Sequence, residues 1–164
     1  MGRIKIDIRN YVPALLTSIS AIHRSAQAAD LRRRFQIGIM EWRAILILSS
    51  RPNISGRRLA TILGTDTAAI SRSLKALEAR GFVKVTRDPT HVRRQKIALT
   101  REGLQVYDRM APIAMQRQEH LLEVLTRGER AQLIDLLQRL LDHAPQLEKA
   151  PSAGKPNRRK HEAN

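Results

Sequence analysis

The chain has 164 residues, a formal net charge of +15 and a pI near 11.5. This length suits one well-cored domain, alone or with a helical appendage. The charge favours a polyanionic partner, either nucleic acid or an acidic membrane surface. The lack of cysteine excludes disulfides, thiolate zinc sites and thiol redox switches.

The sequence shows neither a secretory signal pattern nor an apolar stretch long enough to span a membrane. We therefore expect a soluble cytoplasmic protein without a membrane partner.

The positive charge is unevenly distributed along the chain. The net charge is +6 for residues 1–54, +7 for 55–96, −1 for 97–150 and +3 for 151–164. A chain with its charge concentrated in this way fits a protein with one nucleic-acid-facing side better than a uniformly basic protein.

Apolar spacing and capping residues predict a mainly α-helical chain with one β-hairpin. The predicted helices cover residues 12–35, 40–50, 55–63, 66–80, 100–125 and a last stretch from 126 onward, and the predicted strands cover 82–87 and 95–99. Residues 4–8 alternate apolar and polar side chains as a strand does, but Pro13 favours the first turn of a helix. Pro112 should kink its helix or leave a carbonyl unbonded. The tail 147–164 loses all periodicity and is predicted to be disordered and basic.

The stretch 55–100 reads as a winged helix-turn-helix. Asp66 is the expected N-cap of its second helix, and Gly81 suits the left-handed position that ends it. Three side chains, Ile70, Leu74 and Leu77, form an inward apolar stripe. The outward face carries small and basic residues that suit base edges and phosphates, namely Thr67, Ala68, Ser71, Arg72 and Lys75. In the hairpin loop, the adjacent Arg93 and Arg94 suit a narrow minor groove.

The outer helices carry more apolar surface than a small winged domain can cover. The last helix has a leucine stripe from Leu133 to Leu141, and residues 4–11 add further apolar side chains. Exposed apolar area of this kind usually marks an interface. We expect a homodimer, held by the N-terminal segment and the last two helices.

Several runs in this order resemble the MarR (multiple antibiotic resistance regulator) family over about residues 10–145. They are Glu41-Trp42-Arg43, Leu59 to Gly64, Ile70 to Gly81, Val83, Asp88-Pro89, Leu99 to Gly103 and Leu125 to Glu129. The resemblance implies a homodimer that binds a palindromic operator in double-stranded DNA, with a recognition helix in the major groove and a wing in the minor groove. It also implies that a small aromatic or anionic molecule weakens DNA binding in many members.

The resemblance assigns Ser71 and Arg72 to the family's Ser/Thr-Arg pair, and Arg93 to its wing-tip arginine. His91 stands where the family usually has an acid that orients this arginine. Arg57 and Arg58 replace a small polar residue and an acid, which predicts extra phosphate contacts. The full set of candidate DNA-binding residues is Ser55, Arg57, Arg58, Thr65, Asp66, Thr67, Ala68, Ser71, Arg72, Lys75, Arg87, His91, Arg93 and Arg94.

For an effector, the resemblance indicates residues on the elements that line the family's pocket. The candidates are Tyr11, His23, Trp42, Arg43 and Tyr107, each of which is also an ordinary core or surface residue. No cofactor or metal is expected, because Glu119, His120 and Glu123 have no second cluster of ligands beside them. No motif for catalysis is present, so the chain is not expected to be an enzyme.

The predicted layout is an N-terminal dimerisation segment (1–36), a winged helix-turn-helix (37–100), C-terminal dimerisation helices (101–146) and the tail. The leading hypothesis is a transcriptional regulator, a repressor released by an effector, acting on the nucleoid. An architectural DNA binder without effector control is the alternative, and a protein-interaction module is a third reading.

Overall fold

The computed structural model describes residues 3–87 and 95–149 of the chain. The chain divides into two compact units, Met1–Ile113 and Ala114–Asn164, and helix α5 (Arg101–Leu122) runs from the first into the second. Most of the predicted tail lies outside the described residues, so its disorder stays a prediction. The division into segments by role also stays a prediction.

The elements of the first unit follow the predicted order closely. They are α1 (Val12–Asp30), the π-helical turn η2 (Leu31–Phe35), α2 (Ile39–Ser50), α3 (Gly56–Leu63), α4 (Thr67–Ala79), β1 (Val83–Arg87), β2 (Gln95–Leu99) and the start of α5. The strand considered for residues 4–8 is wrong. A short 3₁₀ turn, η1 (Ile8–Asn10), stands beside this segment instead, with its amide at Arg9 bonded to the Asp7 carboxylate at 3.0 Å.

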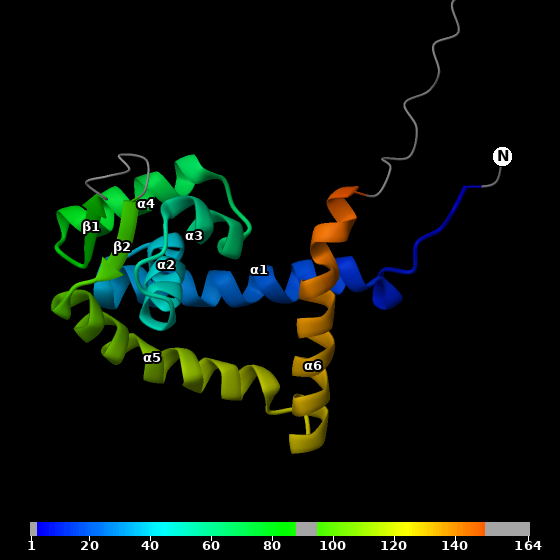
Figure 1. Ribbon diagram of the computed structural model, residues 1–164. Coiled ribbons are helices and arrows are strands. Elements are labelled where there is room, and N and C mark those ends of the chain that lie inside the picture. Colours follow the sequence, from blue (N-terminus) through cyan, green and yellow to red (C-terminus); the bar gives the residue numbers. More distant parts are fainter. Residues whose placement is uncertain (1–2, 88–94, 150–164) are drawn as a thin grey trace, which may run out of the picture. The chain divides into compact units, whose positions relative to one another are not determined.

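The core of this unit lies where α2, α3, α4 and the hairpin pack together (Figure 1). Each of these elements contributes a fully buried side chain, and the largest of them are Ile45, Leu48, Leu59, Ile70, Leu77 and Ile97. The strands pair antiparallel, with Val83 opposite Leu99 and Arg87 opposite Gln95. Ile54 adds an isolated bridge to Ile97, which ties the segment before α3 to the hairpin. Mutual burial of apolar faces therefore holds the helix-turn-helix against its wing.

The second unit contains the end of α5, helix α6 (Arg127–His143) and the 3₁₀ turn η3 (Ala144–Lys149). Helix α5 ends at Leu122, three residues before the predicted end. The predicted capping box is confirmed: the Thr126 amide donates to the Glu129 carboxylate at 2.8 Å, and the Glu129 amide donates to the Thr126 hydroxyl at 3.4 Å. Pro112 lies inside α5 and has no N–H, so it cannot donate to the Asp108 carbonyl.

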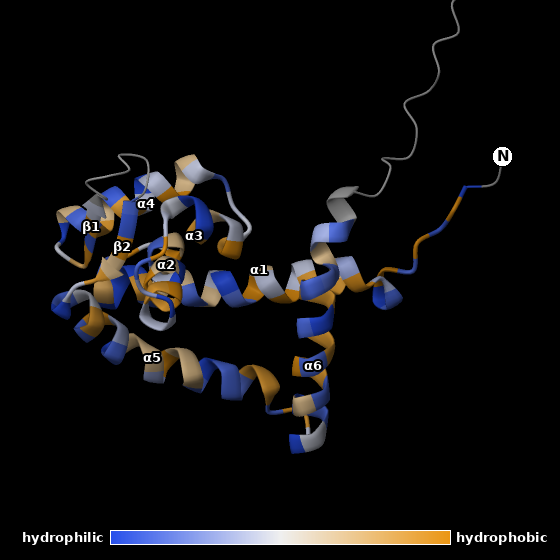
Figure 2. Cartoon of the chain, viewed as in Figure 1, coloured by the Kyte–Doolittle hydropathy of each residue, from blue (hydrophilic) through white to orange (hydrophobic). Residues whose placement is uncertain are grey.

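Two helices carry apolar side chains that are exposed in the single chain. Figure 2 shows apolar residues along both α1 and α6. On α1 these are Val12, Leu15, Leu16, Ile19 and Ile22, and on α6 they are Ile134, Leu136, Leu137, Leu140 and Leu141. The exposed fraction reaches 72% for both Ile22 and Leu141. Within the described ranges, no helix has both the length and the apolar character needed to cross a membrane.

Candidate nucleic-acid interface

Helix α3 places two arginines on the surface at its first turn. The Ser55 hydroxyl accepts a hydrogen bond from the Arg58 amide at 3.2 Å, so Ser55 is the N-cap that the sequence predicts. Arg57 and Arg58 are exposed, while Leu59 and Ala60 are buried behind them. The start of α3 therefore holds both cations facing solvent on a rigid helix.

Asp66 is the N-cap of helix α4. Its carboxylate accepts from the Ala69 amide at 2.7 Å. This backbone hydrogen bond is the main cause that lowers the pKa of Asp66 below its usual value, with a smaller contribution from the charge of Arg72. An ionised Asp66 at the positive end of α4 stabilises the helix start. Asp66 is thus a cap by its geometry, and a DNA contact at this position stays a prediction.

Helix α4 has the two faces that the sequence predicts. Ile70, Leu74 and Leu77 are buried, which confirms the inward stripe. The opposite face carries the predicted recognition side chains, and all of them are exposed: Thr67, Ala68, Ser71, Arg72 and Lys75. The apolar stripe therefore fixes the rotation of α4 about its axis, and this rotation directs the polar side chains outward.

A groove of about 760 Å³ lies between the start of α3, the exposed face of α4 and the hairpin. Five of the predicted residues line it, namely Ser55, Arg57, Thr67, Ser71 and Lys75. The structure adds Asn53, Glu78, Gln95 and Lys96, which the sequence reasoning missed. Glu78 could have been found, because it follows Lys75 by three residues on the same helix face. Lys96 could not have been found from the sequence, because its position in the groove depends on how β2 packs against the helices.

The other candidates fall outside this groove. Arg58, Thr65, Asp66, Ala68 and Arg72 lie on α3, on α4 or in the turn between them, but not among the residues that line it. Arg87 ends β1. The wing-tip residues His91, Arg93 and Arg94 lie outside the described residues, so their roles stay predictions.

Two effector candidates meet in the first unit. The rings of Trp42 and Tyr107 stack with centroids 6.2 Å apart and planes inclined by 23°. Trp42 is only 2% exposed. The guanidinium of Arg43 donates to the Leu63 carbonyl at 3.0 Å and so joins α2 to the end of α3. These contacts explain all three residues as packing groups, and a ligand role for them stays a prediction.

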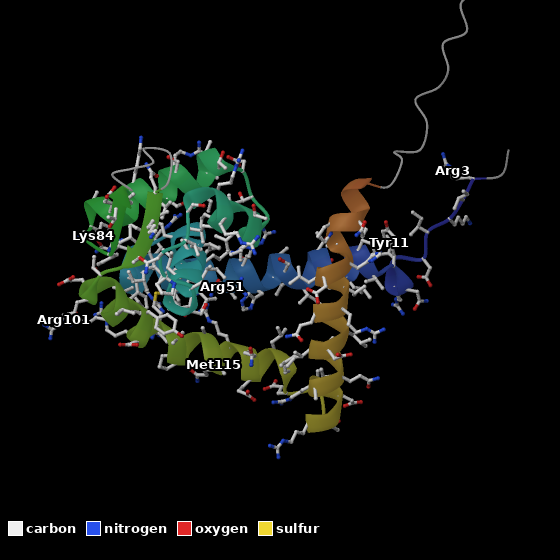
Figure 3. All side chains as sticks on the ribbon, in the orientation of Figure 1. Arg3, Tyr11, Arg51, Lys84, Arg101 and Met115 are labelled. Carbon is white, nitrogen blue, oxygen red and sulfur yellow. The ribbon has the colours of Figure 1, made fainter. Side chains whose placement is uncertain are left out.

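The remaining two effector candidates lie on α1. Tyr11 is the N-cap of α1 and is 44% exposed (Figure 3). His23 lies within α1, twelve residues further along the chain, and is partly buried. At about 1.5 Å per residue, the two positions are about 18 Å apart along the axis. A small molecule cannot contact both residues of one chain.

The carboxylates considered for a metal site have protein partners. Glu119 accepts from Arg130 at 2.6 Å, and the Glu123 carboxylate lies 2.9 Å from Nδ1 of His120. Among the residues that the structure describes, no three His, Asp or Glu side chains gather in a metal-binding group.

Comparison with known proteins gives consistent results. The model of the MarR family matches residues 35–94. A MarR/EmrR family transcriptional regulator from Acinetobacter sp. ADP1 is 31% identical, with a TM-score of 0.78 over 86% of this chain and 99% of that chain. The transcriptional repressor NicR from Pseudomonas putida is 32% identical over 88 residues. That match spans 54% of this chain and 56% of NicR, so the chain spans little more than half the length of this curated relative.

A third similarity concerns the fold alone. Streptococcus pneumoniae FabT, whose crystal structure was solved in complex with DNA, is 22% identical and has a TM-score of 0.67. The alignment covers 83% of this chain and 96% of FabT. The winged helix-turn-helix predicted from the sequence is therefore confirmed as the fold of this chain.

Proposed function

Because this chain belongs to the MarR family of transcriptional regulators, we propose that it represses transcription by binding an inverted-repeat operator as a homodimer. Its relatives are regulators rather than enzymes, in line with the lack of a catalytic motif. The proposal places the protein in the cytoplasm, bound to the chromosome.

The observation that carries this proposal is the exposed face of α4. Ser71, Arg72 and Lys75 project from a helix whose other side is locked into the core. An α-helix fits the major groove, where hydroxyl and guanidinium groups hydrogen-bond base edges. Arg72 is the residue that we assign to a guanine, because a guanidinium matches the O6 and N7 acceptors in a bidentate way.

The groove beside α4 supports a second contact. Arg57, Lys75 and Lys96 line it together with the hydroxyls of Ser55 and Ser71. Cations and hydroxyls in a concave surface suit a DNA backbone, whose phosphates accept hydrogen bonds from both. We assign the three cations and the Ser55 hydroxyl to phosphates, and Arg58 on α3 adds a further cation.

The homodimer is supported by the exposed apolar faces of α1 and α6. Side chains such as Ile19 on α1 and Leu140 on α6, each about half exposed, would otherwise stay in water. Burying apolar surface stabilises a complex by about 25 cal/mol per Å². A second copy of the chain that covers these side chains would therefore be stabilised in the dimer. A two-fold dimer presents two recognition helices, and two inverted half-sites match this symmetry.

An effector that releases the operator completes the proposal. We place a small aromatic or anionic molecule beside the Trp42–Tyr107 stack, since aromatic rings bind aromatic ligands by offset stacking. Opening this stack would shift α2 against α5, the two helices that carry these rings.

The test begins by selecting fragments of the host genome that the purified protein binds. Affinity for the selected fragment and for a random duplex is then measured over a salt series. A regulator binds the selected duplex at least about a thousandfold more tightly than random DNA. A ratio near one would instead support the alternative that the net charge of +15 favours, an architectural DNA binder. Absence of binding at low salt would leave only a protein-interaction role.

A further inference from the structure

The end of helix α1 has carbonyl groups that need donors. The helix continues into the π-helical turn η2, and Gln36 then adopts a left-handed conformation with φ of 54°. A non-glycine residue in this region is uncommon and needs support from its surroundings. The last carbonyls of a helix have no partner within it, so those of Phe35 and Gln36 must be satisfied from elsewhere.

Arg80 supplies these donors from a distant part of the chain. Its Nη1 donates to the Gln36 carbonyl at 2.7 Å, and its Nη2 donates to the Phe35 carbonyl at 2.9 Å. Arg80 is the C-cap of recognition helix α4. The guanidinium also lies over the ring of Phe82, 4.6 Å from its centroid. The two hydrogen bonds and the contact with the Phe82 ring give this planar guanidinium, here called the Arg80 fork, a defined orientation, although the residue is exposed.

The same junction is connected to helix α5. The guanidinium of Arg109 lies 5.6 Å from the centroid of the Phe35 ring. Thr100, immediately before α5, donates from its hydroxyl to the Gly81 carbonyl at 2.6 Å. The C-terminal end of the recognition helix is thus joined both to α1 and to α5.

We propose that Arg80 is a positioning residue, which sets the orientation of the recognition helix relative to α1. The inference rests on the proposed homodimer, in which α1 belongs to the interface between the copies. The fork then fixes the distance between the two recognition helices, and so the spacing of the half-sites that the dimer accepts. Without these two hydrogen bonds, α4 keeps its buried packing against the core. It loses, however, its direct connection to the turn that ends α1, the helix that faces the partner copy.

The experiment compares the full-length protein with three variants. R80A removes the fork. R80K keeps the charge but cannot donate to both carbonyls in the same fixed geometry. K84A is the matched control, because Lys84 is an exposed cation on β1, four residues further along the chain (Figure 3).

Circular dichroism and light scattering first establish that each variant is folded and dimeric. Affinity is then measured for the selected operator and for duplexes with the spacer between half-sites lengthened or shortened by one base pair.

The expected result is a loss of spacing selectivity. Wild type and K84A should bind the native spacing at least about fivefold more tightly than the altered spacings, a coupling of ordinary size. Both Arg80 variants should lose most of this preference, chiefly through weaker binding to the native spacing. R80K separates this effect from the loss of a phosphate contact, since its charge and salt dependence are retained.

Three outcomes would overturn the inference. An equal loss on every duplex would make Arg80 a phosphate contact or a stabiliser of the fold. Wild-type selectivity in both Arg80 variants would show that the fork positions nothing. A wild-type protein that binds the operator without regard to spacing would show that no fixed distance exists. Failure of the proposed function looks different, because the wild type would then bind no duplex specifically.

Discussion

The Thr100 hydroxyl donates to the Gly81 carbonyl at 2.6 Å and accepts from the Gly103 amide at 3.0 Å. One side chain therefore closes the turn after the recognition helix and starts helix α5. Gly81 has a φ of 71°, the left-handed region in which glycine carries no side-chain penalty. The Thr100 amide adds a bond to the Phe82 carbonyl at 3.1 Å, which joins the residue before α5 to the residue before β1.

Gly103→Ala should break this contact. A Cβ at Gly103 would lie 2.0 Å from the Phe82 carbonyl oxygen, so the backbone of one element would have to move. We expect a loss of unfolding free energy of about 3 kcal/mol, the upper end of overpacking costs. Urea unfolding followed by circular dichroism measures it. Gly128→Ala in α6 is the control, because nothing lies within 4 Å of its Cβ and alanine favours helices. Equal stability of the two variants would show that α5 can shift freely.

The cap at Asp66 predicts a pH dependence. The hydrogen bond from the Ala69 amide lowers the pKa of Asp66 below its usual value in the folded chain, so the ionised carboxylate favours folding. This contribution is fully present above the unfolded pKa and is lost as the pH falls through the folded pKa. Asp66→Asn keeps a capping oxygen but cannot titrate. The melting temperature of the wild type should therefore fall more steeply than that of Asp66→Asn as the pH drops through about 4 and below. Parallel curves for the two proteins would contradict the assignment.

Arg72 and Arg58 should affect DNA binding in different ways. Arg72→Ala should cost about 1–3 kcal/mol on the operator and relax the base preference at one position in each half-site. Arg58→Ala should weaken operator and random DNA alike, and lower the slope of log affinity against log salt by about one. Fluorescence anisotropy over a salt series measures both effects. If random DNA lost as much as the operator with Arg72→Ala, Arg72 would be a phosphate contact.

A charge on the exposed face of α6 should weaken the dimer. Leu140 is 52% exposed in the single chain, so Leu140→Lys removes little packing within it. In a dimer the same change buries a charge among leucines, which is costly. We expect monomers by light scattering at concentrations where the wild type is dimeric. Asp142→Lys is the control, since about 100° per residue places it on the far side of α6 from Leu140 and away from the apolar face. A dimeric Leu140→Lys variant would remove α6 from the interface.

The effector site can be tested by fluorescence, because Trp42 is the single tryptophan of the chain. Titration with an aromatic carboxylate such as benzoate should change its emission in a saturable way, over the range that releases the operator. Trp42→Phe keeps an aromatic ring beside Tyr107 but removes the signal, so release should persist in this variant. Release from the wild type without any change in emission would place the effector away from the stack.

The helices and their caps were predictable because the interactions that start a helix are local. Ser55, Asp66 and Thr126 each bond to an amide three residues ahead, and this spacing is visible in the sequence. The two faces of α4 were equally visible, since the spacing of Ile70, Leu74 and Leu77 determines which side enters the core. The sequence by itself therefore determined the winged helix-turn-helix and most of its outward residues.

Contacts between residues far apart in the chain were decided only by the tertiary structure. Lys96 joins the groove because β2 packs against α2 and α3, and Arg80 reaches carbonyls 44 and 45 residues earlier. The Trp42–Tyr107 stack likewise depends on how α2 meets α5. The local spacing of residues does not predict these long-range contacts, because they depend on the angles at which the helices and strands pack against one another.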